Sequence, residues 1–512
     1  MVAQAFCAVN RKVFFDIESA IGYLASPRGR NVAARRRGRW HMAAARRLEP
    51  HPDTPFRYGP RVDFTFEGKP LWGFAGEPLA LALLAGGVKV FGRSAKYHRP
   101  RSPMCLHAHC SSCLMRVNGR PNVRTCDTPC SAGQSVERQT GWPGAGFDLL
   151  RSIDVVYPEE LRHHELFTSS AALSRLASPF VRKMSGAGEL PSGPPPMALP
   201  AEHTRARVVV IGAGAAGLSA ARRLARAGEK AIVFEAEALP GGRLLDGATW
   251  IEDDGGGAGW QKWKSLADPA GLSGIELCCR MPVVALYPGR PPTVVAAGEE
   301  RVRVVQPQRI ILCNGAYDLL PLFVGNDVPG VMTVRALDRM ALGHGVVPAE
   351  PVVLCGDSDE VLRLGALLAE RGVELAGVVT RRREGPQLEA LQEKKIPIVF
   401  DREPARARGG RWLHELELAS HRKAEPDRLL DCGLCAAESP PAPAYELGHH
   451  AGCRVFFSSS GGYRIAADSS GRTSRDDIFA AGHCAGAADT AAAMAAGEQA
   501  AGACLESLAQ AG

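Results

Sequence analysis

The sequence predicts an α/β fold in which a parallel sheet with helices on its faces follows a smaller, cysteine-containing unit. From Arg207 onward, short β-branched runs alternate with Ala- and Leu-rich stretches, and this alternation is typical of parallel sheets covered by helices. Residues 208–211 and 352–354 are separate strand starts, and residues 478–481 form a late strand before an Ala-rich helix. We therefore expect one nucleotide-binding fold interrupted by another.

Length and composition exclude several classes of protein. The 512 residues suffice for about three domains. The chain is 46% hydrophobic and 22% charged, as globular proteins are, and it has no apolar run of the ~18 residues that a membrane helix needs. The net charge of +7 is local, because residues 1–47 hold ten Lys or Arg and two acidic residues, which leaves 51 basic and 52 acidic residues elsewhere. A nucleic-acid-binding groove is therefore not expected.

The first residues and the cysteine content indicate the compartment. The Arg-rich opening reads as a disordered arm, a transit-like segment, or sequence upstream of a start at Met42. It lacks the continuous apolar region of a secretory signal. Fifteen cysteines without such a signal favour a reducing compartment, the cytoplasm, where clustered cysteines are more often metal ligands than disulfides.

Composition changes also predict the domain limits. Val62, Phe64 and Phe66 alternate with polar residues before a turn and a returning strand at 70–74, so a hairpin is expected, followed by a short helix at 77–85. The expected order is a basic arm at 1–47, a cysteine-containing domain at 56–145, a linker segment at 146–204, an outer domain at 205–335 and 428–512, and an insert at 336–427.

Four cysteines have the spacing of a metal centre. Cys105, Cys110 and Cys113 follow one another at intervals of five and three residues, and Cys126 comes thirteen later. This is the plant-type ferredoxin spacing for a 2Fe-2S cluster, in which three thiolates come from one tight loop. Four-thiolate zinc and unligated thiols are the alternatives, although zinc sites usually show two separated Cys-x2-Cys pairs. Cysteines 130, 278, 279, 432 and 435 are interpreted as incidental, and His107 and His109 as bordering solvent.

A glycine motif predicts dinucleotide binding. Gly212, Gly214 and Gly217 directly follow the strand at 208–211 and open a helical stretch, and Glu235 ends the next strand. Gly212 would allow the turn, Gly214 the close approach of a pyrophosphate, and Gly217 the packing of helix on strand. Glu235 would accept hydrogen bonds from the adenosine ribose.

Two later segments favour FAD over NAD as the dinucleotide. Gly241, Gly242 and Arg243 resemble the second flavoprotein signature, and no cysteine pair follows them, so a redox-active disulfide is not expected. The segment ending at Gly482 and His483 resembles one in which flavoproteins place Gly-Asp, whose acid holds a ribityl hydroxyl. Histidine can still make that hydrogen bond, which is worth about 1 kcal/mol.

The insert carries a degenerate form of the same motif. Two of its three glycine positions are occupied by Ser358 and Val361, and Asp357, Asp359 and Glu360 add negative charge beside the place for a pyrophosphate. Arg residues 381–383 follow the second strand and could bind an NADP 2′-phosphate, but a solvated charge run is the commoner meaning. Nicotinamide binding is therefore doubtful.

These motifs together resemble one family. Similar segments are GRSAKYHRPR at 92–101, VNGRP at 117–121, TGWP at 140–143, FVRK at 180–183 and FVGNDVPGVM at 323–332. They resemble the α subunits of heterotetrameric sarcosine oxidase and of related multi-subunit opine, hydroxyproline and cyanide-forming glycine dehydrogenases, over residues 56–512. Cys313, Asn314 and Gly315 stand where Ala-Thr-Gly is usual.

The resemblance implies a flavoprotein with two dinucleotide-binding domains behind a ferredoxin-like β-grasp domain. It also implies an electron-transfer subunit of an amine or amino-acid dehydrogenase or oxidase, with FAD and a 2Fe-2S cluster, whose β-type flavoprotein partner carries the amine site. The alternatives are a self-sufficient NAD(P)H-dependent reductase and a non-catalytic scaffold subunit. The expected FAD-binding residues are Gly212, Gly214, Gly217, Glu235, Gly242, Arg243, Gly315, Gly482 and His483, and the cluster ligands are Cys105, Cys110, Cys113 and Cys126. The family's folate-binding domain has no counterpart within the 512 residues.

Overall fold

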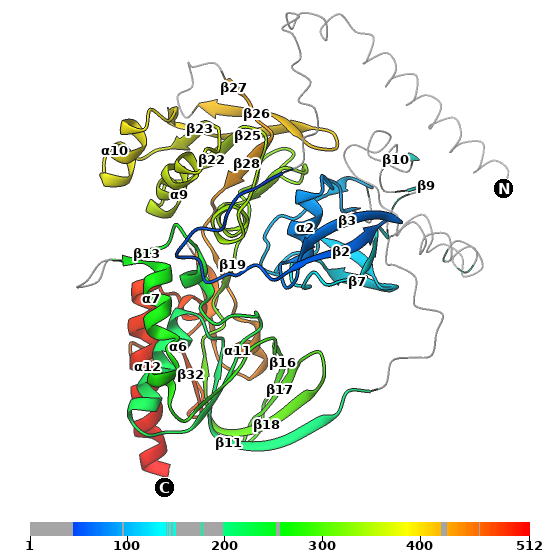
Figure 1. Cartoon of the computed structure of the whole chain (residues 1–512). Coiled ribbons are helices and arrows are strands. Elements are labelled where there is room, and N and C mark those ends of the chain that lie inside the picture. Colours follow the sequence, from blue (N-terminus) through cyan, green and yellow to red (C-terminus); the bar gives the residue numbers. More distant parts are fainter. Residues whose placement is uncertain are drawn as a thin grey trace, which may run out of the picture.

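The computed structural model places three units around a common junction (Figure 1). It describes residues 45–94, 97–139, 141, 143–144, 147–149, 175, 178, 198–251, 257–420, 427–459 and 461–511. The arm up to residue 44, most of the linker segment at 146–204, and the segment at 180–183 lie outside the described residues. In Figure 1 the outer domain is at the bottom, the insert at the top and the cysteine-containing unit at the right.

The cysteine-containing unit is a β-grasp, as expected. Its mixed five-stranded sheet has the order β3-β2-β8-β6-β7, and α2 (Leu79–Ala85) packs on it with leucines that are almost fully buried. The predicted hairpin is formed by β2 and β3. The strands are β2 (Arg61–Phe66), β3 (Lys69–Phe74), β6 (Leu114–Val117), β7 (Arg120–Arg124) and β8 (Ser135–Glu137), with β4 (Gly92–Arg93) and β5 (Pro100–Arg101) pairing beside them.

The outer domain is a seven-stranded sheet with helices on its side. Its order is β15-β12-β11-β18-β17-β16, and β32 pairs with β18. Strands β12, β15, β18 and β32 run parallel to the β11 direction, so their carboxyl ends meet at one edge. The elements are β11 (Ala201–Ile211), α6 (Ala215–Arg226), β12 (Ala231–Phe234), α7 (Gly259–Leu266), β15 (Ile275–Cys278), β16 (Val283–Tyr287), β17 (Thr293–Ala297), β18 (Val302–Leu312), β32 (Ile478–Ala480) and α12 (Thr490–Ala511).

The insert has a second parallel sheet, which extends past the predicted limits of 336–427. Its order is β20-β28-β22-β23-β24, and both β20 and β28 lie outside those limits. Strand β20 precedes the predicted insert and β28 follows it. Because these two strands pair with each other, together they form one side of the insert's sheet. The elements are β20 (Val331–Thr333), β22 (Val352–Cys355), α9 (Asp359–Glu370), β23 (Leu375–Thr380), α10 (Pro386–Glu393), β24 (Ile398–Phe400) and β28 (Leu434–Ala437), with an antiparallel sheet of β25 (Arg402–Gly409), β26 (Leu413–Ser420) and β27 (Arg428–Asp431).

The cysteine-containing unit and the insert share one apolar core. Buried side chains of α2 and β2 belong to the same cluster as Leu337, Leu342 and Leu362 of the insert. Strand β1 (Arg46–Arg47) pairs with β21 (Val346–Val347), and Arg47 binds both oxygens of Glu77, at 2.9 and 2.8 Å. The predicted arm therefore ends before Arg46, because these two residues are part of the fold.

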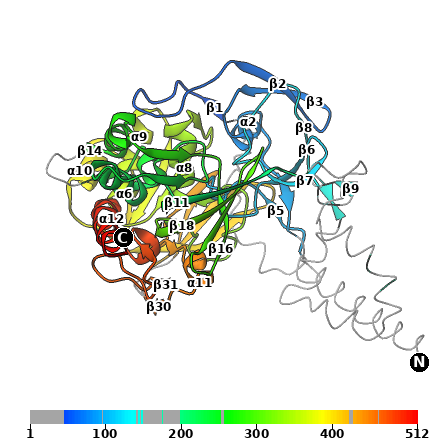
Figure 2. The same ribbon diagram turned by 90° about the horizontal axis from the view of Figure 1, so that it is seen from below.

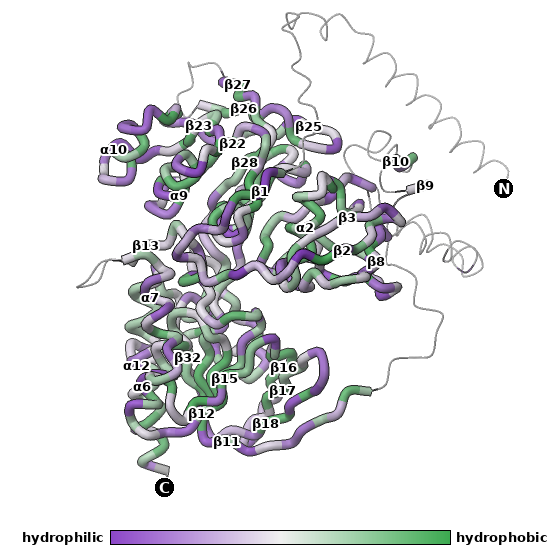
Figure 3. The backbone as a smooth tube through the Cα atoms, viewed as in Figure 1, coloured by the Kyte–Doolittle hydropathy of each residue, from purple (hydrophilic) through white to green (hydrophobic). Residues whose placement is uncertain are grey.

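The remaining elements are short and lie mostly in connections. Figure 2 shows β30 and β31 beside α11 along the lower margin of the molecule in that view. Figure 3 shows hydrophobic residues gathered on the two parallel sheets and on α2, with hydrophilic residues on α10. No helix in the described ranges is sufficiently long and apolar to cross a membrane. The short elements are β9 (Pro143–Gly144), β10 (Phe147–Asp148), η3 (Gly242–Leu245), β13 (Trp250–Ile251), β14 (Gly257–Ala258), η4 (Pro269–Leu272), β19 (Ala316–Tyr317), α8 (Val334–Asp338), η5 (Arg339–Gly343), β29 (Ala442–Pro443), α11 (Glu446–His450), β30 (Val455–Ser458), β31 (Gly462–Ile465) and η6 (His483–Ala485).

Close packing of α12 on α6 gives a stability prediction. A Cβ at Gly497 would lie 2.1 Å from the carbonyl oxygen of Ala216, whereas a Cβ at Gly502 on the same helix would meet no atom within 4 Å. Gly497→Ala should destabilise the outer domain by about 1–3 kcal/mol through overpacking. Gly502→Ala should be neutral or stabilise it by up to about 1 kcal/mol, because Ala is the better helix former. Urea unfolding followed by circular dichroism measures both, and equal midpoints for the two variants would contradict this account of the packing.

Candidate functional site

The four cysteines of the predicted cluster come together in one loop region. Cys105, Cys110 and Cys113 lie between β5 and β6, and Cys126 follows β7. The sulfur atoms of Cys105 and Cys110 are 3.4 Å apart, and the thiols of Cys113 and Cys126 hydrogen-bond each other. In the first pair the hydrogen bond from Cys105 lowers the pKa of Cys110 to about 5. The same contacts raise the pKa of Cys105, and in the second pair they lower the pKa of Cys113 and raise that of Cys126. Each pair therefore favours one thiolate, the form that metals bind.

This donor set fits a two-iron cluster. When four cysteines ligate a 2Fe-2S cluster, each iron receives two thiolates, and the sequence-distant Cys126 completes the second pair. Among the described residues the four cysteines lie as two pairs, and no three His, Cys, Asp or Glu side chains are grouped closely enough to hold a metal ion. The backbone N–H of His107 points at the Cys105 sulfur and that of Ala108 at the Cys126 sulfur, and such bonds tune a cluster's reduction potential.

The two histidines of this loop differ in exposure. His109 is exposed, as expected, but His107 is buried, so that expectation was wrong. The Nδ1 atom of His107 lies 2.7 Å from Arg339 and 3.4 Å from Glu237. The loop therefore packs against the outer domain and the insert, and the spacing of residues within the loop could not predict this contact.

The three glycines of the dinucleotide motif differ in what surrounds them. Gly212 has φ of 95°, a left-handed conformation that favours glycine. A Cβ at Gly217 would lie 1.9 Å from the Gly212 carbonyl oxygen, whereas at Gly214 the nearest atom would be 4.0 Å away. Gly217 thus serves the packing of α6 on the turn, and the space at Gly214 is open to a ligand. Their assignment to FAD stays a prediction that this geometry fits.

Glu235 lies where a ribose acceptor is expected. It follows β12 directly, and its carboxylate accepts hydrogen bonds from the backbone N–H groups of Ala213 (2.7 Å) and Glu237 (2.9 Å). Burial raises the pKa of Glu235 to about 7. The carboxyl group is therefore held rigidly beside the glycine turn, with its remaining lone pairs free of the backbone bonds.

The other predicted FAD-binding glycines lie at the same edge of the sheet. Gly241 donates its N–H to the carbonyl oxygen of Ala213 at 2.7 Å. This bond holds Gly241 and Gly242 against the turn that contains Gly212 and Gly214. Gly315 follows β18 and Gly482 follows β32, both with positive φ. A Cβ at Gly315 would meet no atom within 4 Å. Since β11, β18 and β32 are adjacent and parallel, these residues lie at the edge of the sheet where such folds bind dinucleotides.

Arg243 and His483 complete the predicted set. Arg243 lies 3.2 Å from Asp318 and 3.3 Å from Glu360 of the insert, so its guanidinium spans two units. Burial, together with Arg243 and Arg335, lowers the pKa of His483 to about 4. His483 is therefore neutral near pH 7, unlike the acid usual at this position, and one ring nitrogen can donate while the other accepts.

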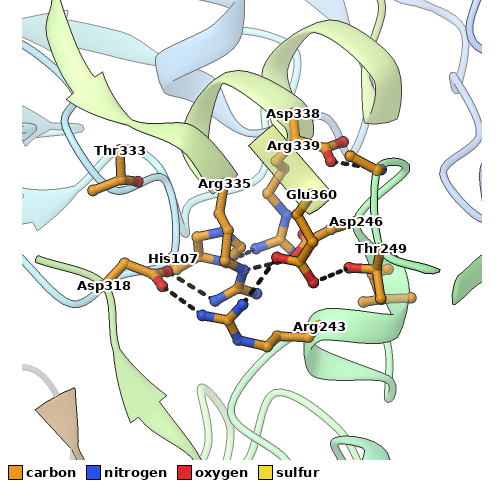
Figure 4. A network of polar contacts seen from close by, with 12 residues as sticks. His107, Arg243, Asp246, Thr249, Asp318, Thr333, Arg335, Asp338, Arg339 and Glu360 are labelled. Carbon is orange, nitrogen blue, oxygen red and sulfur yellow. Dashed lines mark hydrogen bonds and ion pairs between the residues drawn. The ribbon is translucent and has the colours of Figure 1, made fainter. Parts of the chain in front are cut away.

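A buried network of charges connects the three units (Figure 4). Arg335 bonds to Asp246 (2.5 Å) and Asp318 (2.8 Å), and Asp338 accepts the N–H groups of Gly247 (2.8 Å) and Ala248 (2.7 Å). Sequence reasoning missed these residues. Their spacing at i, i+3 and i+4 (335, 338 and 339) is the signal that would have placed them on one helical face.

The nucleotide loop of the insert is satisfied internally. The carboxylate of Glu438, beyond β28, accepts the N–H groups of Asp357 (3.1 Å) and Ser358 (3.2 Å), which a pyrophosphate would otherwise bind. Arg381 bonds to Asp357 at 2.7 Å, and Arg382 to Asp359 at 2.6 Å. The three acidic residues are thus paired rather than free, since Asp357 and Asp359 bind arginines and Glu360 faces Arg243, and it is Glu438 that occupies the N–H groups of the loop.

The cysteine assignment predicts which thiols are needed for iron. Cys113→Ser should lose the cluster, because it removes one of two ligands to an iron. The matched control is Cys130→Ala, since Cys130 is equally buried in the same unit but lies outside both pairs. Iron and sulfide analysis with electron paramagnetic resonance after reduction measures the outcome. Zinc in place of iron in the unsubstituted protein, or iron loss in Cys130→Ala alone, would contradict it.

The surroundings of Gly214 predict a variant that folds without FAD. Gly214 has φ of −72° and ψ of −166°, which alanine adopts readily, and the added Cβ meets no protein atom closer than 4.0 Å. Gly214→Ala should therefore keep its unfolding midpoint but lose FAD affinity, and Gly214→Val more so. Fluorescence titration with FAD measures this, and full flavin occupancy in Gly214→Val would disprove the site.

Comparisons with known proteins agree with this geometry. Residues 59–141 match the model of a 2Fe-2S iron-sulfur cluster binding domain. The α subunit of sarcosine oxidase from Rhizobium meliloti (strain 1021) is 29% identical over 376 residues, 70% of this chain and 38% of the relative. An opine oxidase subunit from Agrobacterium tumefaciens (strain Ach5) is 27% identical over 331 residues, 59% of this chain and 65% of the relative. The chain thus spans less than two thirds of each of these relatives.

The fold and the remaining domain have counterparts too. The L-proline dehydrogenase of P. horikoshii superposes with a TM-score of 0.61 at 19% identity, covering 88% of this chain and 74% of that one. Residues 206–500, more than half of the chain, match the model of the pyridine nucleotide-disulphide oxidoreductases. The expected kinship and cofactors are confirmed: the chain belongs to the pyridine nucleotide-disulphide oxidoreductase family and is an FAD-dependent oxidoreductase with a 2Fe-2S domain, related to subunits of sarcosine and opine oxidases.

Proposed function

We propose that this chain is the electron-transfer subunit of a complex that oxidises a small amine or amino acid, with the amine site on a β-type flavoprotein partner. The observation that supports the proposal is the contact of the cluster loop with residues close to two of the predicted FAD-binding residues. His107 reaches Glu237, two residues after Glu235, at 3.4 Å. His109 packs edge-on against Tyr317, two residues after Gly315, with ring centroids 5.1 Å apart.

The chemistry of the two cofactors suits this division of roles. Amine oxidation at the partner's flavin would release two electrons as a hydride, and the FAD of this chain would pass electrons from that flavin on singly to a one-electron carrier such as a 2Fe-2S cluster. The chain's own contribution is to hold both groups close together. Its cysteine pairs fix the irons, and the edge formed by β11, β18 and β32 orients the dinucleotide.

The relatives support a partner, because the sarcosine and opine oxidase relatives are described as subunits of oxidases. The self-sufficient reductase is disfavoured by Glu438, which occupies the N–H groups that a nicotinamide dinucleotide needs. The scaffold hypothesis is disfavoured because both cysteine pairs and the open space at Gly214 are intact.

Stopped-flow mixing of the oxidised protein with nucleotides and amines tests the proposal. Neither NADH nor NADPH should bleach the flavin rapidly, because the insert's loop is blocked. Sarcosine or an opine should reduce it only when the co-purified partner is present, with dithionite as the positive control.

Rapid bleaching by either nucleotide would establish the reductase instead. The scaffold hypothesis would replace the proposal if the complex oxidised its amine equally well with Cys113→Ser or Gly214→Ala in place of the unsubstituted chain.

A further inference from the structure

Arg339 of the insert bonds to both of the other units at one point. It begins η5 in the insert, and its buried guanidinium donates to Glu237 of the outer domain at 2.8 Å and, through its other terminal nitrogen, to the second carboxylate oxygen. The same guanidinium donates to His107 Nδ1 at 2.7 Å and approaches the carbonyl oxygen of Leu106 at 3.4 Å. Both of these acceptors lie between the cluster ligands Cys105 and Cys110.

The bonding pattern is specific to arginine. A planar guanidinium can bind both carboxylate oxygens and still direct a donor at a third group, which a lysine ammonium does without fixed directions. Burial opposes the ionisation of Glu237, but Arg339 holds the pKa of the Glu237 carboxyl well below the usual range. The pair is therefore a fixed positive charge balanced by a fixed negative one, beside the cluster loop.

We propose that Arg339 is a positioning residue for electron transfer between FAD and the 2Fe-2S cluster, which clamps the cluster loop to the outer domain and, together with Glu237, sets the cluster's reduction potential. The inference rests on the proposed electron-transfer function. When both groups are bound, one electron would pass from reduced FAD to the oxidised cluster, so that the flavin would be oxidised by one electron, one iron would change from ferric to ferrous, and no bond would form or break.

The two parts of this role can be separated by charge. Reduction adds a negative charge to the cluster, so a nearby cation raises its potential and a nearby anion lowers it. Arg339→Met leaves Glu237 unpaired and should lower the potential, whereas Glu237→Gln leaves Arg339 unbalanced and should raise it. The double variant is neutral but lacks the clamp. Its potential should lie near that of the unsubstituted protein while its transfer rate remains low.

The experiment measures potential and rate on the full chain with both cofactors bound. Redox titration followed by electron paramagnetic resonance should show opposite shifts in the two single variants, each about 59 mV, which corresponds to a tenfold change for a one-electron couple. After flash photoreduction of the flavin, bleaching of the cluster should be slower by about tenfold or more in Arg339→Met and in the double variant, since a misplacement of ~1 Å can cost about a hundredfold in rate. Arg339→Lys should keep the potential and lose part of the rate.

The matched control is Arg207→Met, which also removes an arginine from a carboxylate, Glu229 at 2.9 Å, but near the amino end of β12. It should change neither quantity. An unchanged potential and rate in Arg339→Met would overturn the inference. If that variant fails to fold, an unchanged rate in Arg339→Lys together with an unchanged potential in Glu237→Gln would overturn it. A double variant with the unsubstituted rate would refute the clamp. Absence of flavin-to-cluster transfer in the unsubstituted protein would instead reject the proposed function.

Discussion

Buried charge at the junction of the three units is the constraint on which their arrangement depends. Arg335 and Arg339 lie on the same short helical segment, and the side chains of both are largely buried. An unpaired buried guanidinium would cost several kcal/mol, so each must have carboxylate partners. Those partners, Asp246, Asp318 and Glu237, all belong to the outer domain. Only a few orientations of the insert relative to the outer domain therefore pair both arginines. The insert is held in one of these orientations beside the edge of the outer sheet.

The insert keeps a nucleotide-binding outline whose loop serves the protein itself. Its sheet is needed to bury residues such as Leu354 and Val378, independently of any ligand. At the start of α9, Glu438 takes the backbone donors, while Glu360 reaches Arg243 and Thr249 of the outer domain. The helix end that would have faced a phosphate instead faces a neighbouring unit of the same chain.

The sequence predicted those parts of the site that depend on local spacing. Cys105, Cys110 and Cys113 are close in the chain, and Gly212 to Gly217 form one turn, so their geometry follows from a few neighbouring residues. Arg339 and Glu438 interact with residues 102 and 80 positions away in the sequence. Hydrophobic periodicity predicts local elements and gives no information on such distant contacts. The limits of the insert were missed for the same reason, because β20 and β28 are joined by pairing across the whole insert. Likewise, the burial of His107 is caused by two other units rather than by its own loop.

The shared core of the cysteine-containing unit and the insert determines how electrons can travel. Some carriers work by swinging a tethered domain between two sites, which requires an interface that separates easily. Here α2 and β2 belong to one continuous apolar cluster with the insert, and β1 adds a strand pairing across the same boundary. Separation would expose that core to water, so the iron-sulfur unit stays in place. In the proposed electron-transfer role, an external electron donor or acceptor would have to come to it, and a fixed distance rather than the diffusion of a domain would govern the speed of the internal step.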